Sequence, residues 1–387
     1  MSVSQNFTDI RPTLNLNFAR SKTLDPRITF ERASIGTYVG ADGLIKTAAA
    51  DEARFDHDPL TGESLGLLIE EQRTNYYTTS ETMTLGRLIQ SSQWTWTSFT
   101  EGGPQGGGYI RWERIGTTAS PEWNYAISYN NTGLSIGDKF VVTFYARCPN
   151  GTLDSIRISN PDQEAEVFNI DSQWKKFTKV FTYGIQSGLT FFRVNRAHTP
   201  TYVIGTTYDI ACLQIEKYEF PTSYIPTSGS QFTRQPDNAS ITGTNFSSWY
   251  NQNEGAFVLN FHKKWSEPWG YFRRPFRVKN DDSTNRISVG VTNGGGNTQI
   301  YASVVTGSVQ QIDGYRFFTP TETNSVAVAI ANNDYSAFAN GTSYASDTSV
   351  TVPTVDTAVF DPTNLSIARL AYYPQRLTDS QLQNLTK

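Results

Sequence analysis

The chain has 387 residues, of which 13% are aromatic and only 18% are charged, and its formal net charge is −4. Many aromatics with few charges favour half-buried β-sheets over helical bundles. The slight acidity argues against a general nucleic-acid-binding role, and three His with two Cys are too few for a zinc-finger array or a disulfide framework.

The first 75 residues are short segments separated by turns. Residues 14–21 (LNLNFARS) alternate apolar and polar side chains, as a half-buried strand does. Asp42-Gly43 stands between TYV and LIKT and predicts a hairpin turn. Hairpins this short cannot bury a core of their own. We therefore predict that residues 1–75 form an arm of β-hairpins that docks on a neighbouring domain or another subunit.

Residues 76–236 are predicted to form an antiparallel jelly roll. Several strand-like segments are separated by clusters of Gly, Pro, Asn and Asp, a spacing typical of sandwiches and jelly rolls. The clearest of them are KFVVTFYARC (139–148), SIRIS (155–159), WKKFTKVFTYG (174–184), LTFFRVN (189–195) and TTYDIACLQIEKYE (206–219).

Residues 237–387 are predicted to form a second β-domain that closes with a helix. LTDSQLQNL (377–385) is the best helix candidate, with Thr378 as its N-cap and Asp379 in its first turn. The clearest strands are AFVLNFHKKW (256–265), NRISVGV (285–291), QIYASVV (299–305), SVAVAIAN (325–332) and YSAFANG (335–341). The predicted class is therefore all-β, with two antiparallel jelly-roll or β-sandwich domains in tandem behind an N-terminal β-hairpin arm.

The start of the chain lacks the basic and apolar regions of a secretory leader, and its longest apolar run is about six residues, far short of a bilayer span. We expect synthesis in a cytoplasm and no membrane insertion. Cys148 and Cys212 are accordingly expected to stay reduced and buried.

Three stretches of the middle region, VVTFYARCPNG, WKKFTKVFTYG and YDIACLQIEKYEFPTSYIPT, resemble carbohydrate-binding modules with a galactose-binding-like jelly roll. In the last, Gln214 and Glu216 followed by Thr222 to Thr227 resemble the closing strand of such modules. The segments ETNSVAVAIANNDYSAFANGT and LSIARLAYYPQRLTDSQLQNLT resemble a concanavalin-like, laminin-G-type lectin domain. The pairing of these two modules behind the N-terminal segment LDPRITFERASIGTYVGADGLIKTAAADEARFDHDP is similar to tailed-bacteriophage virion proteins.

Catalysis is not expected, although both module types also occur joined to glycoside hydrolases. The strand with paired carboxylates that concanavalin-like glycosidases use is missing, and the nearest pair, Glu164 and Glu166, lies in a loop-like segment. His57, His198 and His262 stand in unrelated contexts, and none lies near a nucleophile elbow. We therefore predict that the chain is not an enzyme.

One aromatic stretch is a candidate glycan-binding site. Flat rings combined with a few fixed hydrogen-bonding groups suit sugar recognition, but a jelly-roll core would use the same rings. The candidate residues are Trp94, Trp96, Arg111, Trp112, Trp123 and Tyr125.

A second stretch, between 265 and 282, interleaves aromatics with arginines and suits a subunit interface. Its candidate residues are Trp265, Trp269, Phe272, Arg273, Arg274, Phe276 and Arg277. The resemblance to both module types also suggests a structural calcium, for which Asp209, Asp281 and Asp282 have suitable oxygen chemistry. No other cofactor is expected.

These observations predict a structural component of a tailed-phage virion, in a fibre, baseplate or surface appendage, with host-surface polysaccharide as a ligand. The chain would be made in the host cytoplasm, assemble as a homo-oligomer and contact other virion proteins through its N-terminal arm. The alternative is a capsid-decorating or connector protein whose lectin-like folds act only as a scaffold.

Overall fold

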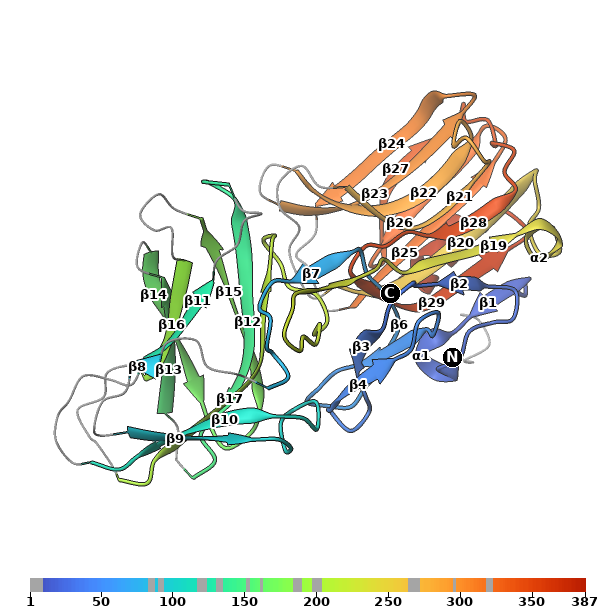
Figure 1. Ribbon diagram of the computed structural model, residues 1–387. Coiled ribbons are helices and arrows are strands. Elements are labelled where there is room, and N and C mark those ends of the chain that lie inside the picture. The colour runs from blue at the N-terminus through green and yellow to red at the C-terminus, as the bar shows by residue number, and fades with distance from the viewer. Residues whose placement is uncertain are drawn as a thin grey trace, which may run out of the picture. The chain divides into compact units, whose positions relative to one another are not determined.

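The computed structural model describes residues 10–82, 88–89, 94–116, 124–129, 135–150, 154–160, 163–183, 190–196, 204–263, 272–294, 297–317 and 323–387. Across these residues the protein is almost entirely antiparallel β-sheet (Figure 1). The predicted all-β class is thus confirmed. No helix in the described part of the chain is long and apolar enough to cross a membrane.

The chain divides into two compact units. We call the first the split unit, because it combines Met1–Gly43, Thr47–Gln72 and Gln235–Lys387. The second, the inserted unit, comprises Leu44–Lys46 and Arg73–Arg234. The N-terminal segment that the sequence set apart as an arm thus falls almost wholly in the same unit as the C-terminal residues.

The split unit contains two large sheets with a shared core. One has the order β27-β26-β25-β20-β29-β6-β5, with β1 added on β29, and the other has the order β2-β19-β28-β21-β22-β23-β24. Inward-facing side chains such as Leu259, Val328, Val278 and Val289 fill the space between them. The strands of the first sheet are β1 (Leu14–Leu16), β5 (Arg54–His57), β6 (Ser64–Ile69), β20 (Glu254–His262), β25 (Thr323–Ala331), β26 (Asp334–Ala339), β27 (Thr342–Asp347) and β29 (Leu365–Tyr373). Those of the second are β2 (Thr29–Glu31), β19 (Asn238–Thr242), β21 (Phe272–Lys279), β22 (Arg286–Gly294), β23 (Asn297–Thr306), β24 (Val309–Phe317) and β28 (Thr357–Phe360).

Short elements complete the split unit. The helices are α1 (Phe18–Ser21), α2 (Gly243–Ser247) and α3 (Asp379–Leu385). The predicted closing helix and its cap are confirmed, because Thr378 and Gln381 form a reciprocal capping box at the start of α3. The predicted turn at Asp42-Gly43 lies between β3 (Gly36–Val39) and β4 (Ile45–Ala48), a strand that begins in the inserted unit and ends in the split unit. Gly43 adopts a φ of 74° that favours glycine.

A buried ionic cluster joins the N-terminal and C-terminal parts of the split unit. Asp237 Oδ1 accepts from Arg32 Nη1 at 3.0 Å, and Asp237 Oδ2 accepts from Arg54 Nη2 at 2.5 Å. Glu70 accepts from Arg54 Nη1 at 2.7 Å, and its backbone N–H donates to Asp237 Oδ2 at 2.7 Å. Two cations and two anions are thereby balanced in a site closed to solvent. Burial lowers the pKa of Arg54, but Asp237 and Glu70 raise it by more.

The inserted unit is a sandwich of two five-stranded sheets, with orders β15-β12-β17-β10-β9 and β14-β13-β16-β11-β8. Side chains from both, including Phe140, Phe144, Ile156 and Ile158, form its core. Its strands are β8 (Leu88–Ile89), β9 (Trp94–Phe99), β10 (Tyr109–Arg114), β11 (Asn124–Tyr129), β12 (Lys139–Arg147), β13 (Asp154–Asn160), β14 (Gln163–Ile170), β15 (Lys175–Thr182), β16 (Thr190–Arg196) and β17 (Thr207–Glu216). A two-stranded sheet of β7 (Arg73–Asn75) and β18 (Phe232–Arg234) completes it.

Gln214, Glu216 and Thr222, which belong to the motif that resembles the closing strand of carbohydrate-binding modules, form a buried hydrogen-bond network. Glu216 at the end of β17 accepts hydrogen bonds from Gln214 Nε2 at 2.8 Å, Thr222 Oγ1 at 2.6 Å and Thr222 N at 3.0 Å. Gln214 Oε1 also accepts from the backbone N–H of Ile225 at 2.6 Å. These bonds fix the segment that follows β17 against the sheet, so the motif serves the fold of the inserted unit.

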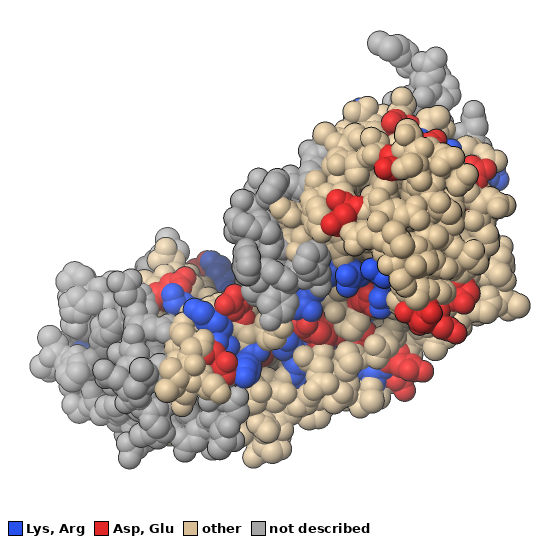
Figure 2. All heavy atoms as spheres, turned by 90° about the horizontal axis from the view of Figure 1, so that it is seen from above, with Lys and Arg blue, Asp and Glu red and all other residues tan. Residues whose placement is uncertain are grey.

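Both cysteines are buried and neither forms a disulfide, as expected. Burial raises the pKa of the Cys212 thiol, which keeps it protonated. Basic and acidic side chains of the described residues lie interspersed on the face that Figure 2 shows, in keeping with the small net charge of the chain.

We predict that Asp237→Asn lowers the free energy of unfolding of the split unit by about 3–5 kcal/mol, because it leaves two buried guanidinium groups without a full counter-charge. Urea denaturation of the full chain measures this change. Asp25→Asn is the matched control. Its partner Arg27 and Asp25 itself are partly exposed, so removing that pair should cost less than about 1 kcal/mol. Equal effects of the two substitutions would contradict the prediction.

Candidate functional site

The predicted glycan-binding rings lie in different environments. Trp94 is 4% exposed and Trp112 is 0% exposed, and both belong to the core of the inserted unit. Trp96 pairs with Trp112 across β9 and β10, is half-buried and packs against the same core. Trp94 and Trp112 therefore offer no face to a ligand, which corrects their assignment to the site. Trp123 and the side chain of Tyr125 lie outside the described residues.

Arg111 lies on the opposite face of the same sheet. Side chains alternate along β10, so that Ile110 and Trp112 point into the core and Arg111 points away from it. We call this face of the sheet β15-β12-β17-β10-β9 the outer face of the inserted unit (Figure 1).

Asp209 of β17 lies at the centre of this outer face, between Arg111 and Arg147 in the strand register. Its Oδ1 accepts from Arg111 Nε at 2.6 Å, and its Oδ2 accepts from Arg111 Nη2 and Arg147 Nε, both at 2.8 Å. The Asp209 side chain is 0% exposed, whereas those of Arg111 and Arg147 are 27% and 23% exposed. Its hydrogen bonds raise the pKa of Arg111. One buried carboxylate thus fixes two guanidinium groups at the surface.

An aromatic row runs beside this charged row. Phe99 and Tyr109 stack with their ring centroids 4.6 Å apart and 4° between planes, and Trp174 meets Tyr109 edge-on at 5.7 Å. Arg147 lies 4.5 Å from the centroid of Trp174, and Arg111 lies 5.2 Å from that of Phe99. Cation–π contacts of this kind hold the guanidinium planes against the rings. Tyr109 is buried, whereas Phe99 and Trp174 are partly exposed.

This arrangement suits a sugar ring. Asp209 engages three guanidinium N–H groups, and within the described part of the chain no other partner bonds the remaining nitrogens of Arg111 and Arg147. Those donors are fixed in space and can bind hydroxyl or carboxylate oxygens. The exposed parts of Phe99 and Trp174 supply the adjacent apolar surface. Together they provide both contacts that sugar recognition requires.

The structure places the metal candidates in other roles. Both oxygens of Asp209 are bound by arginines, a cationic environment that opposes a metal ion. Asp281 and Asp282 are exposed in the turn between β21 and β22, where Thr284 hydrogen-bonds to Asp282 and lowers its pKa. In the described residues no three His, Cys, Asp or Glu side chains gather as a metal ligand set.

The described interface candidates of the split unit lie in different environments. Phe276 is 1% exposed and belongs to the core, which corrects its assignment to a surface. Arg273 pairs with Glu71 at 2.7 Å, and Arg277 pairs with Asp361 at 2.8 Å. Arg274 remains half-buried on the sheet. Trp265, Trp269 and the side chain of Phe272 lie outside the described residues.

The side chains considered for catalysis have structural partners. Glu166 pairs with Lys179 at 2.8 Å, and the side chain of Glu164 lies outside the described residues. His57 Nδ1 contacts the carbonyl oxygen of Val39 at 2.9 Å, and His262 Nδ1 contacts Thr323 Oγ1 at 3.2 Å. His198 lies outside the described residues.

Sequence reasoning missed four members of the site, Phe99, Tyr109, Arg147 and Trp174. A signal was present, because Tyr109 and Arg111 alternate with core residues on β10, and Tyr145 and Arg147 do so on β12. The order of strands in the sheet, which brings β10, β17 and β12 together, was the information that the sequence lacked.

No family model and no curated protein matches the chain. Among solved structures, the CBM40 module of the Ruminococcus gnavus IT-sialidase bound to alpha2,3 sialyllactose is similar, with 19% identity and a TM-score of 0.31 over 35% of this chain and 84% of that one. Domain 4 of the Geobacillus stearothermophilus arabinanase AbnA, in complex with arabinotriose, has 17% identity and a TM-score of 0.31 over 44% and 84%. The CBM22-1 xylan-binding domain of Paenibacillus barcinonensis Xyn10C has 9% identity and a TM-score of 0.28 over 38% and 94%.

We predict that Asp209→Asn destabilises the inserted unit by about 2–3 kcal/mol, because a neutral amide cannot neutralise two flanking guanidinium groups. The effect is smaller than for a fully buried pair, since solvent reaches both arginines. Thermal unfolding of the full chain measures it. Asp171→Asn, which removes an exposed pair with Lys175, should leave the midpoint nearly unchanged. If Asp209→Asn also leaves the midpoint unchanged, Asp209 does not organise this face.

Proposed function

We propose that the inserted unit binds glycan through its outer face and that the chain is a surface component of a tailed-phage virion, in a fibre, baseplate or appendage. The observation that carries the glycan proposal is the pair of arginines held by Asp209 beside the rings of Phe99, Tyr109 and Trp174. No catalytic step is included, because the site offers binding groups alone.

The rigidity of the face favours binding. Arg111 is held by two hydrogen bonds and two ring contacts, and Arg147 by one hydrogen bond and two ring contacts. Long side chains that are already ordered lose less conformational freedom when a ligand arrives. The face is therefore prepared for a hydroxyl-rich or acidic sugar without rearrangement.

The virion part of the proposal is supported by the sequence resemblance alone. It includes homo-oligomerisation and contacts with other virion proteins. A direct test is labelling of purified phage particles with antibodies raised against the recombinant chain. We expect labelling at the distal end of a tail or fibre. Labelling confined to the shell or neck would favour the scaffolding alternative, and no labelling of any particle would reject a virion role.

We predict that Trp174→Ala and Arg147→Gln each weaken glycan binding by about tenfold or more, because each removes a contact at the centre of the site. The wild-type chain is first screened on an array of neutral and acidic bacterial oligosaccharides. Calorimetry with the strongest binder then gives the dissociation constants. Thermal unfolding verifies that the variants are folded.

Lys139→Gln is the matched control. Lys139 is exposed on the same strand and face as Arg147 but eight residues away, or about 26 Å. It should bind like the wild type. If no oligosaccharide binds the wild-type chain, or if all three variants behave alike, the outer face is not a glycan site.

A further inference from the structure

The second large sheet of the split unit has a polar face of its own. Its inward side chains, such as Val278, Ile287 and Val304, lie in the core. The face that points away from this core carries rows of polar side chains across neighbouring strands. In one row Arg277 of β21 pairs with Ser288 of β22, and Ser288 pairs with Ser303 of β23. We call this face the basic face.

Three guanidinium groups gather on the basic face. Arg274 lies where the pairing of β21 with β22 shifts register, Arg277 lies three residues further on, and Arg286 lies on β22. Burial lowers the pKa of Arg286, and repulsion from Arg274 and Arg277 lowers it further. Among the described residues, Asp361 is the one carboxylate that binds any of these three arginines. It contacts Nε and Nη2 of Arg277, both at 2.8 Å. Positive charge is therefore in local excess.

Several buried polar atoms of the basic face have no hydrogen-bond partner in the described part of the chain. The Ser288 side chain is 0% exposed, and its hydroxyl makes no hydrogen bond. The buried Nε of Arg274 likewise makes no hydrogen bond to the described residues. An unsatisfied buried hydroxyl costs free energy, and so does crowding of like charges. An oxyanion bound by Arg274 would offset the crowding of like charges, whereas the Ser288 hydroxyl is closed to a ligand.

Aromatic rings flank the arginines on one side. Tyr301 of β23 lies directly against Gly290 of β22, where a Cβ atom would come within 2.0 Å of the ring, so glycine is required for this approach. Tyr315 of β24 lies next to Tyr301, with 6.0 Å between ring centroids, and is 39% exposed. Arg274 interacts electrostatically with both tyrosines. Tyr315 thus offers an exposed ring beside the positive charge.

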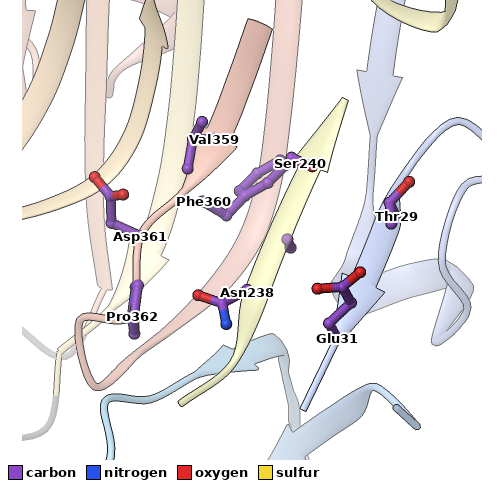
Figure 3. Close-up of a pocket in the computed structure, with 9 residues that line it drawn as sticks. Thr29, Glu31, Asn238, Ser240, Val359, Phe360, Asp361 and Pro362 are labelled. Atoms are coloured by element: carbon purple, nitrogen blue, oxygen red, sulfur yellow. The ribbon is translucent and has the colours of Figure 1, made fainter. Parts of the chain in front are cut away.

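A pocket of about 140 Å³ adjoins the arginines on the other side. It is lined by residues of β2, β19 and β28 and of the loop after β28, among them Glu31, Asn238, Ser240 and Asp361 (Figure 3). Asp361 belongs both to the pocket and to the ion pair with Arg277. The pocket therefore provides hydroxyl-binding carboxylate and amide groups next to the basic face.

We propose that the basic face binds an acidic sugar, with its carboxylate on the guanidinium group of Arg274 and its hydroxyl groups toward the pocket beside Asp361. Planar guanidinium groups match a carboxylate in geometry, and an exposed tyrosine ring supports the sugar. This site belongs to the split unit and stands independently of the site on the inserted unit.

The test uses the full chain and calorimetry at low salt with oligogalacturonate, and with the same oligosaccharide after methyl esterification. Esterification removes the charge and keeps the sugar backbone, so we expect binding of the acid alone, weakened by added salt. Arg274→Gln should weaken it by about tenfold or more. Ser288→Ala should bind like the wild type without loss of thermal stability, because the hydroxyl it removes is closed to the ligand and has no hydrogen-bond partner in the described residues.

Arg20→Gln is the control, since Arg20 is exposed on α1 of the same unit. It should bind like the wild type. Equal binding of acid and ester, or undiminished binding by Arg274→Gln, would overturn the proposal. Loss of binding in Trp174→Ala rather than in Arg274→Gln would also overturn it, because the acidic sugar would then belong to the inserted unit.

Discussion

The fold of the split unit depends on the carboxylate of Asp237. Its residues come from chain segments separated by the entire inserted unit, and Asp237 is bound by Arg32, Arg54 and the backbone of Glu70 from the N-terminal segment. A buried charge is tolerated only when its partners are in place. Docking of the N-terminal segment therefore neutralises the buried carboxylate of Asp237. An undocked N-terminal segment would leave that carboxylate without its two arginines, which would cost folding free energy.

A buried carboxylate that holds two arginines also occurs in the inserted unit, but there it leaves the arginines at the surface. Asp209, like Asp237, is a buried carboxylate that holds two arginines. Around Asp237 the arginines are themselves enclosed and use their other nitrogens on backbone carbonyls, as Arg32 does with Ala49. Around Asp209 both guanidinium groups reach solvent and keep donors available. The two clusters therefore differ in the exposure of the arginines, and this exposure is the reason for proposing a binding site at Asp209 alone, although the contacts at the carboxylate are alike.

The sequence predicts those structural features that are set by residues close together in the chain. Period-two alternation and Asp42-Gly43 are local, so the strands, the turn and the helix capped by Thr378 were predictable. The aromatic stretch around Trp94 and Trp112 could not be divided into core and surface by sequence alone, because either use requires the same residues. The register that places Arg147 beside Asp209 is set by strands 62 positions apart, which no local pattern records.

Local charge, rather than the net charge of −4, governs what the two faces can bind. Surface charges are screened over about 8–10 Å at ordinary ionic strength, so a ligand responds to the few side chains nearest to it. On the basic face those include Arg274, Arg277 and Arg286, of which Arg277 is paired with Asp361. Acidic residues elsewhere contribute little at that distance. A slightly acidic chain is therefore compatible with recognition of acidic sugars, and salt is the variable that most directly reveals it.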